Sequence, residues 1–446
     1  MNLQRKGPTD YRADETTICL VNCYADDNKG DHGIILATLL GLRQAYLDKY
    51  KEEPKLFAVS TFGKSDSRNS PAHRFLKKVA DRVIPNSVPQ RYVESSGFIR
   101  NMTKAVSVTV RLTLGVLRIG IYKASGGRAI KVLSKDQRAY VRSGVVVSKG
   151  GSIFYSKGGL RAYFFLMRML SPLLFSILLH KKPIVFAQSI GPFNGKLSRF
   201  QARWIFNRCR HVYVRETFSQ DLLEELGVIP GRVTVVPDIA FILKSYIKPK
   251  VPVRKKKILC VTARNLSSDV RVQAAFESKM ASILEGFLKN RPNWIVQFVP
   301  QVIGPGKNQD DRVVQKAIKK CMDPGYYRRL VFVDDDLSVE ELCALYKEAD
   351  LLLGTRLHST IFAATQGTPA VVLEYQQKKA LGTFKQLGVE DYVLDWQAPE
   401  KKIQEQLAAS VKGMVGRTKK LDAATADVVK ELEAACKYII NTIEEN

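Results

Sequence analysis

An arginine and a histidine, Arg356 and His358, lie two residues apart between two apolar runs in the stretch 351–375. Residues 350–354 are typical of a buried strand and a helix is predicted from Ser359, so both side chains stand where a strand gives way to a helix. The first turn of a helix binds phosphate or carboxylate through its free N–H groups and its partial positive charge. A guanidinium suits the same anions, and a histidine can carry a proton near neutral pH. We therefore predict an anion site with an acid beside it, completed by Leu357 and Ser359. The alternative is structural: Arg356 pairs with Asp350, and His358 only supports the fold.

Other polar residues follow predicted strands, where ligands bind in open parallel sheets. Arg215 follows the strand HVYV and Arg264 follows ILCVTA, although Arg215 could instead pair with the neighbouring Glu216. A loop with the sequence GDHG is expected between the first strand and the first helix, and its glycines would let the backbone approach a ligand. The remaining candidates at strand ends share this position: Gly30, Asp31, Gly150, Gly151, Ser189 and Asp238.

Strands and helices alternate along most of the chain, which predicts parallel sheets with crossover helices. The first strand is expected at 16–24, the first helix at 34–50 and a tight loop after the strand that begins at 182. A basic, proline-bearing stretch at 243–257 reads as a linker between two such series. We predict an α/β fold with an N-terminal domain at 1–247, a C-terminal domain at 255–400 and C-terminal helices at 401–446. Each domain is expected to be doubly wound and Rossmann-like.

The chain is strongly basic, with 70 Lys and Arg against 43 Asp and Glu among 446 residues, a net charge of +27. Such a field attracts nucleic acid, anionic membranes or acidic small molecules. Residues 91–150 alone hold 12 basic and 2 acidic residues, and an apolar segment with regular cations lies inside the insertion at about 91–142. Two interpretations stay open for it: a surface for anionic membranes, or a core-packed segment whose Lys and Arg stems point outward. Nucleic acid is not expected as a partner, because aromatic residues do not alternate with these cations.

Cysteine usage and hydropathy favour a cytoplasmic protein. The seven cysteines are scattered and lack the paired spacing of a zinc site, so reduced thiols and no metal are expected. The N-terminus lacks the apolar centre of a signal peptide, and no stretch reaches the ~20 apolar residues of a membrane span. A peripheral position on the inner face of the plasma membrane is the alternative that the insertion leaves open.

The chain resembles the polysaccharide pyruvyl transferase family. The matching motifs occur in the family's order, from the first strand to about residue 380. They are GDHGIILATLLGL, KGGSIF, FAQSIGPF, VYVRET, VVPDIAF and ADLLLGTRLHSTIFAATQGTPAVVLEY, of which TRLHS and QSIGPF are the most specific.

This resemblance implies two domains facing a cleft, as in the GT-B glycosyltransferase architecture. It implies transfer of pyruvate from phosphoenolpyruvate to two hydroxyls of a sugar as a cyclic ketal, with release of phosphate. By the family's pattern Arg356 and His358 contact phosphoenolpyruvate, and Arg215 lies near it. Protonation of C3 requires a general acid, for which we assign His358, and Asp238 or Asp31 could take the hydroxyl protons. The reaction needs no metal or nucleotide, so phosphoenolpyruvate and a sugar acceptor, polymeric or lipid-linked, are the expected partners.

The sequence departs from the family at two places. Lys149 stands where a glycine is usual, which puts the acceptor side in doubt. Where many members have Tyr-Asp-Pro-Lys, this chain has Tyr-Gln-Gln-Lys, so Lys378 matches but the turn before it does not. Two other functions stay open: a nucleotide-sugar glycosyltransferase of the same architecture, and a non-catalytic binder of an anionic polymer.

Overall fold

The computed structural model describes residues 14–64, 71–90, 98–250, 255–304, 306, 308–375 and 379–445. Contacts between residues divide the chain into two compact units. The first unit comprises Met1–Tyr24, Leu39–Val236 and Ala435–Asn446, and the second comprises Ala25–Thr38 and Pro237–Ala434. The domain boundaries expected at 247, 255 and 400 stay predictions. Compared with the expected domains, grouping by contacts assigns residues 25–38 to the second unit and residues 435–446 to the first.

The first unit is built on a parallel sheet whose strands run in the order β3-β2-β1-β4-β6-β7-β8, with β5 beside β6. The middle strand β1 pairs Ile18 with Leu56 of β2 on one side and with Val145 of β4 on the other. The order reverses between β1 and β4, as in a doubly wound sheet. Its strands are β1 (Asp14–Cys23), β2 (Lys55–Ser60), β3 (Arg82–Ile84), β4 (Ser143–Ser148), β5 (Gly151–Ser156), β6 (Ile184–Phe193), β7 (His211–Val214) and β8 (Val233–Val235).

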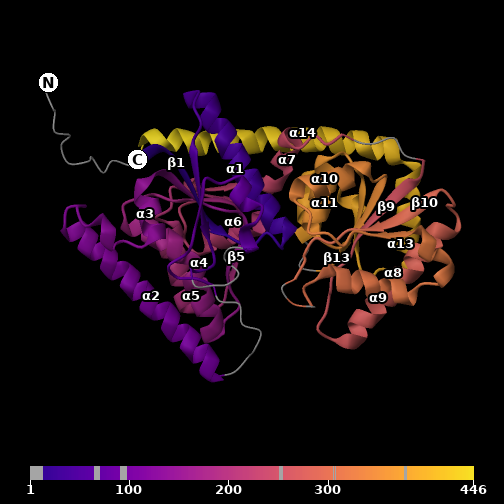
Figure 1. Ribbon diagram of the computed structural model, residues 1–446, viewed down its shortest axis with the longest axis horizontal. Helices are drawn as coiled ribbons and strands as arrows, with labels where there is room; N and C mark the ends of the chain where they lie inside the picture. The colour runs from indigo at the N-terminus through magenta and orange to yellow at the C-terminus, as the bar shows by residue number, and fades with distance from the viewer. Residues whose placement is uncertain are drawn as a thin grey trace. The chain divides into compact units, whose positions relative to one another are not determined.

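The second unit repeats this plan in the order β11-β10-β9-β12-β13-β14, again parallel (Figure 1). Cys260 of β9 pairs with Gln297 of β10 and with Leu352 of β12, so the order reverses between β9 and β12. The strands are β9 (Lys257–Thr262), β10 (Trp294–Phe298), β11 (Leu330–Phe332), β12 (Leu351–Gly354), β13 (Ala370–Glu374) and β14 (Val393–Asp395).

Helices connect the strands in both units, as the alternating sequence predicts. Those of the first unit are α2 (Phe98–Ala124), α3 (Lys135–Arg142), α4 (Gly159–Leu178), α5 (Lys196–Phe206) and α6 (Thr217–Glu225). Those of the second are α7 (Leu243–Tyr246), α8 (Val270–Lys289), α9 (Asp311–Cys321), α10 (Val339–Glu348), α11 (Leu357–Thr365), α12 (Lys379–Gln386) and α13 (Glu400–Lys412). Two continuous helices, α1 (Lys29–Tyr50) and α14 (Met414–Asn441), have residues in both units.

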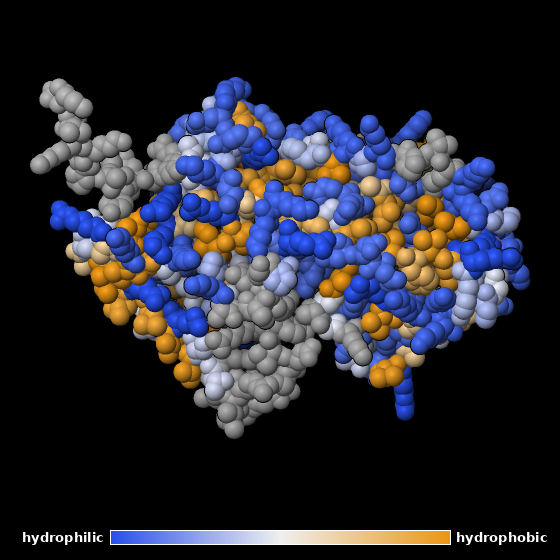
Figure 2. Space-filling view, in the orientation of Figure 1, coloured by the Kyte–Doolittle hydropathy of each residue, from blue (hydrophilic) through white to orange (hydrophobic). Residues whose placement is uncertain are grey.

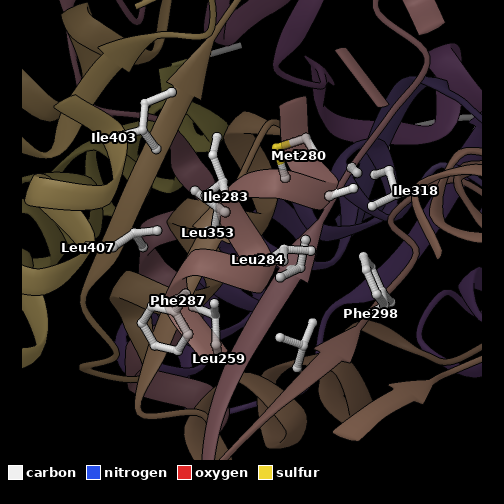
Figure 3. Close-up of a cluster of buried hydrophobic side chains, with 14 of the residues drawn as sticks. Leu259, Met280, Ile283, Leu284, Phe287, Phe298, Ile318, Leu353, Ile403 and Leu407 are labelled. Atoms are coloured by element: carbon white, nitrogen blue, oxygen red, sulfur yellow. The ribbon is translucent and has the colours of Figure 1, made fainter. Parts of the chain in front are cut away.

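The core of the second unit lies between the sheet and helices α8, α9 and α13 (Figure 3). Apolar residues recur at helical spacing in α8, and Met280, Ile283 and Leu284 are buried against strand residues Leu259 and Leu353. Figure 1 shows α10 and α11 on the other side of this sheet. Because both faces are covered, the strands are apolar throughout rather than alternating.

Two predicted features differ from the structure. The tight loop expected after the strand that begins at 182 is wrong, because residues 188–193 continue that strand as part of β6. The stretch 233–241 is a strand only as far as Val235, and a 3-10 helix follows at Ile239–Ile242. The stretch read as a linker begins with the short helix α7, while residues 251–254 lie outside the described part of the chain.

Within the basic apolar insertion at about 91–142, the long helix α2 packs on the core of the first unit, and a short 3-10 helix and α3 follow it. Residues 91–97 lie outside the described part of the chain. Two segments are long and apolar enough to cross a membrane by length and composition, Ala105–Ala124 of α2 and Gly159–Leu178 of α4. Buried residues make up 28% of the first and 44% of the second. Helices of this length and apolar composition occur in the cores of folded proteins as well as in membranes.

Candidate functional site

Two arginines stand at the point where the strand order of the second sheet reverses. Arg264 follows β9 and Arg356 follows β12, and these neighbouring strands pair Thr262 with Gly354. Crevices at such reversal points, beyond the carboxyl ends of parallel strands, are where ligands bind in doubly wound sheets. The topology thus brings together two residues that the sequence places 92 positions apart.

Arg356 is oriented by a buried carboxylate, Asp311. Nε of Arg356 donates to Oδ2 of Asp311 at 2.8 Å, and Nη2 donates to Oδ1 at 2.5 Å. The arginine is 17% exposed and the aspartate 1%. Asp311 also accepts from the backbone N–H groups of Gln301 and Val302, at 2.9 and 3.1 Å. The structural alternative with Asp350 is wrong, because Arg356 pairs with Asp311 while Asp350 accepts from the backbone of Ile258.

Arg264 is crowded by a second cation. Its Nη1 donates to the hydroxyl of Tyr375, and its guanidinium lies 4.6 Å from the centre of that ring. Burial lowers the pKa of Arg264 first, and repulsion from Arg356 lowers it further. Two guanidinium groups that disfavour each other's charge are stabilised when an anion binds between or beside them.

His358 lies in the first turn of α11 and faces an acid. Its Nε2 lies 3.5 Å from Oδ2 of Asp238, longer than an ordinary hydrogen bond. Asp238 is 2% exposed and His358 21% exposed. The other oxygen of Asp238 accepts from the backbone N–H of Ala240 at 3.0 Å, because Asp238 caps the 3-10 helix that follows. Two of the predicted catalytic residues, His358 and Asp238, are therefore neighbours in the structure.

Hydroxyl groups fix the start of α11. Ser359 is fully buried, lies 2.8 Å from the hydroxyl of Thr262 and donates to the carbonyl of Arg356 at 2.6 Å. Thr355 donates to the carbonyl of Thr262 at 3.1 Å. Ser359 thus holds the helix start in place, and its use as a ligand contact stays a prediction. Leu357 is the first residue of α11, where backbone N–H groups have no partner within the helix.

The predicted GDHG loop is wrong, because these residues form the first turns of α1. The glycines let α1 approach α11: a Cβ at Gly30 would lie 2.6 Å from Nδ1 of His358, and one at Gly33 would lie 2.3 Å from Cζ of Phe362. Asp31 accepts from the side-chain amide of Asn28 at 2.7 Å. The motif GDHG therefore brings a helix, rather than a loop, against the histidine.

A further group of predicted residues lies in the first unit. Arg215 is 7% exposed, and its Nε donates to the hydroxyl of Ser189 at 2.6 Å. Ser189 in turn donates to Glu216 at 3.0 Å, and Arg215 lies 3.7 Å from the same carboxylate. The suggested pairing of Arg215 with Glu216 is thus present, with Ser189 placed between them. Gly150 lies between β4 and β5, and Gly151, the first residue of β5, has a φ of 123°, which glycine adopts readily.

Two site residues, Asp311 and Tyr375, were not predicted from the sequence. Asp311 follows Asp310 at a helix start, and this pair of acids before a helix is the one signal that could have indicated it. Tyr375 directly follows β13, the same position that pointed to the arginines. The predicted Lys378 lies outside the described residues. Within the described ranges, no group of three or more His, Cys, Asp and Glu is placed to hold a metal ion.

Comparison with solved structures gives the fold. UDP-GlcNAc 2-epimerase from Neisseria meningitidis, solved with UDP-GlcNAc, matches 96% of this chain and 100% of its own, with a TM-score of 0.56 and 10% identity. A glycosyltransferase from Rickettsia africae matches 96% of this chain and 99% of its own, with a TM-score of 0.54 and 13% identity. These proteins share a GT-B-like architecture of two α/β domains, as the sequence predicts.

Comparison of sequences gives the family. The amylovoran biosynthesis protein AmsJ of Erwinia amylovora is 26% identical over 445 residues, which cover 93% of this chain and 95% of AmsJ. The family model for polysaccharide pyruvyl transferase matches residues 28–377, a range that holds both Arg356 with His358 and Arg215 with Ser189. This chain therefore belongs to the polysaccharide pyruvyl transferase family.

Proposed function

We propose that this protein transfers pyruvate from phosphoenolpyruvate to a sugar, as a cyclic ketal, and releases phosphate. The observation that carries the proposal is the pair Arg264 and Arg356 at the strand reversal of the second sheet, beside the start of α11. Phosphoenolpyruvate carries a phosphate and a carboxylate on one carbon. Two neighbouring guanidinium groups whose charges repel each other and a helix N-terminus match that arrangement of charge.

The proposed chemistry requires one proton to be given to carbon. His358 donates a proton to C3 of phosphoenolpyruvate, which becomes the methyl group and makes C2 electrophilic. A first sugar hydroxyl bonds to C2. A second hydroxyl then bonds to C2 as the bond from C2 to the phosphate oxygen breaks. Of the two hydroxyl protons, one replaces the proton lost by the acid and the other leaves with phosphate.

Asp238 is the residue that we propose receives a hydroxyl proton or returns one to His358. Its side chain lies 3.5 Å from Nε2 of His358 and is almost fully buried. Asp31 is the less suitable candidate, because its side chain accepts a hydrogen bond from Asn28.

The acceptor that we propose is a sugar of a polysaccharide or of a lipid-linked oligosaccharide. Support comes from the relative AmsJ, which is named for the biosynthesis of amylovoran. In the first unit, we propose that Arg215, Ser189, Gly150 and Gly151 contact substrate. Arg215 follows the carboxyl end of β7 and is bonded to Ser189 within β6, while Gly150 and Gly151 lie where β4 gives way to β5. A cytoplasmic location and phosphoenolpyruvate as the only donor are parts of the same proposal.

The test is thermal stabilisation of the full chain by phosphoenolpyruvate, with UDP-sugars measured in parallel. A ligand at about 100 times its dissociation constant stabilises the folded state by ~2.7 kcal/mol. The variant Arg264→Gln should lose most of this stabilisation. Arg291→Gln is a matched control, because Arg291 also stacks on an aromatic ring, at 4.5 Å from Phe287, and burial also lowers its pKa.

Stabilisation of the wild type and of Arg291→Gln by phosphoenolpyruvate, but not of Arg264→Gln, would support the donor site. Stabilisation by UDP-sugars alone, lost in Arg264→Gln, would replace the proposal with a nucleotide-sugar glycosyltransferase. Equal stabilisation of both variants by phosphoenolpyruvate would place the donor elsewhere in the protein.

A further inference from the structure

Helix α2 has two apolar faces, and the described residues cover only one of them. On one face, Val108, Leu112 and Ile119 are buried at 7, 6 and 3% exposure, packed with Phe175 of α4. On the opposite face, large apolar side chains are exposed to between 44 and 57%. These are Val106, Val110, Leu114, Leu117 and Ile121, which we call the α2 stripe.

The α2 stripe is continuous along the helix. Its residues 106, 110, 114, 117 and 121 are spaced by three or four positions, which places them on one line. From 106 to 121 the line is about 22 Å long at 1.5 Å per residue. Figure 2 shows apolar side chains along the edge of the molecule where α2 runs in Figure 1. A surface helix of a folded protein normally shows one apolar face, so the second face needs an explanation.

The charged residues of the segment that forms α2 are all positive. From Phe98 to Lys135 the sequence has eight Lys and Arg residues and no Asp or Glu. Arg111 and Arg118 are seven positions apart and partly exposed, at the border between the two faces, and Lys123 is exposed near the end of the helix. Their aliphatic stems can lie along the apolar surface while the charged ends reach outward.

We propose that α2 lies in the headgroup region of an anionic lipid bilayer. The α2 stripe faces the acyl chains, and the flanking cations contact lipid phosphates. A spanning orientation does not fit, because the opposite face of the same helix is packed on the core. A second copy of this chain on the α2 stripe fits poorly, because symmetric pairing would bring the same cations of two helices together with no acid between them. The inference is independent of the proposed reaction.

The test is flotation of the full chain with vesicles of phosphatidylcholine, and with vesicles of phosphatidylcholine and phosphatidylglycerol in equal parts. The wild type should float with the anionic vesicles and much less with the neutral ones. Leu117→Asp should reduce binding to anionic vesicles by at least about tenfold, because it removes a large apolar side chain from the contact and adds a repelled charge. Leu197→Asp in α5 is the matched control, since Leu197 is 55% exposed and Leu117 57%.

Arg118→Gln separates the electrostatic contribution to membrane binding from the apolar contribution. It should weaken binding to anionic vesicles by a factor of about five while leaving binding to neutral vesicles unchanged. Equal unfolding temperatures of the wild type and both leucine variants would show that the fold is unaffected.

Three results would overturn the inference. One is failure of the wild type to float with anionic vesicles even at low salt. Another is equal loss of binding in the two leucine variants. The third is a dimeric wild type by light scattering that becomes monomeric in Leu117→Asp with no binding to vesicles, which would assign the α2 stripe to a contact between two copies of the chain.

Discussion

Arg356 and Asp311 form a two-point ion pair in which the acid is fully buried and the arginine is partly exposed. Asp311 uses both oxygens on Arg356 and also accepts two backbone N–H groups, so it is fixed before any ligand binds. The hydrogen bonds to Asp311 come from Nε and Nη2, which form one edge of the Arg356 guanidinium. The second edge of the guanidinium, with Nη1, makes no hydrogen bond to the described residues and is the edge available to an anion.

Asp311→Asn should destabilise the protein by about 2–4 kcal/mol, because Arg356 loses the negative charge with which it pairs in a buried contact. Urea unfolding with wild type and variant at neutral pH measures this difference. Asp310→Asn is the control, since Asp310 caps the same helix and asparagine is also a good cap. If the two variants lose the same stability, the Arg356 pair has no special structural role.

His358→Asn should leave phosphoenolpyruvate binding within a few fold but lower turnover by about 10²–10⁴, the usual contribution of a general acid. Binding is read from thermal stabilisation, and turnover from phosphate release with extracted glycan as the acceptor. His180→Asn provides the control, because His180 is exposed and its φ of 62° is one that asparagine tolerates. A variant at 358 that loses binding and keeps its maximal rate would make the histidine a binding residue rather than an acid.

Gly33→Ala should cost about 1–3 kcal/mol of folding free energy, because its Cβ would lie 2.3 Å from the ring of Phe362, which is fully buried. Gly382→Ala, within α12, meets no atom within 4 Å and should be neutral or slightly stabilising. Chemical unfolding of both variants makes the comparison. Partial recovery of stability in Gly33→Ala with Phe362→Leu would identify the close approach of α1 to α11 as the cause.

The stability of the protein should fall in mildly acidic solution, in part because of His211. Burial lowers the pKa of His211 below its ordinary value of 6.5, and the ring lies 2.9 Å from the hydroxyl of Thr234. The unfolded chain therefore takes up a proton that the folded chain resists, so this contribution is complete above pH 6.5 and is lost as the pH falls through the folded pKa. Unfolding free energies of wild type and His211→Gln, measured across this range, should converge as the pH falls. Parallel curves would contradict the prediction.

The sequence predicted the two parallel sheets and the positions of Arg215, Arg264 and Arg356 just after strands, because buried strands and strand-to-helix junctions have strong local patterns. For the same reason, it predicted that Arg356 and His358 lie where a strand gives way to a helix. It could not predict Asp311, because the partner of a buried arginine is chosen by packing between segments far apart in the chain. It misread GDHG for a related reason: glycines that permit a loop also permit two helices to pack closely, and only the position of Phe362 and His358 decides between them.

The division of α1 and α14 between the two units has a consequence for dissecting the protein. The second unit includes residues 25–38, and the first unit includes residues 435–446. A cut in the gene between the two sheets therefore leaves each fragment without one of its own segments. It yields two incomplete units rather than two separate domains.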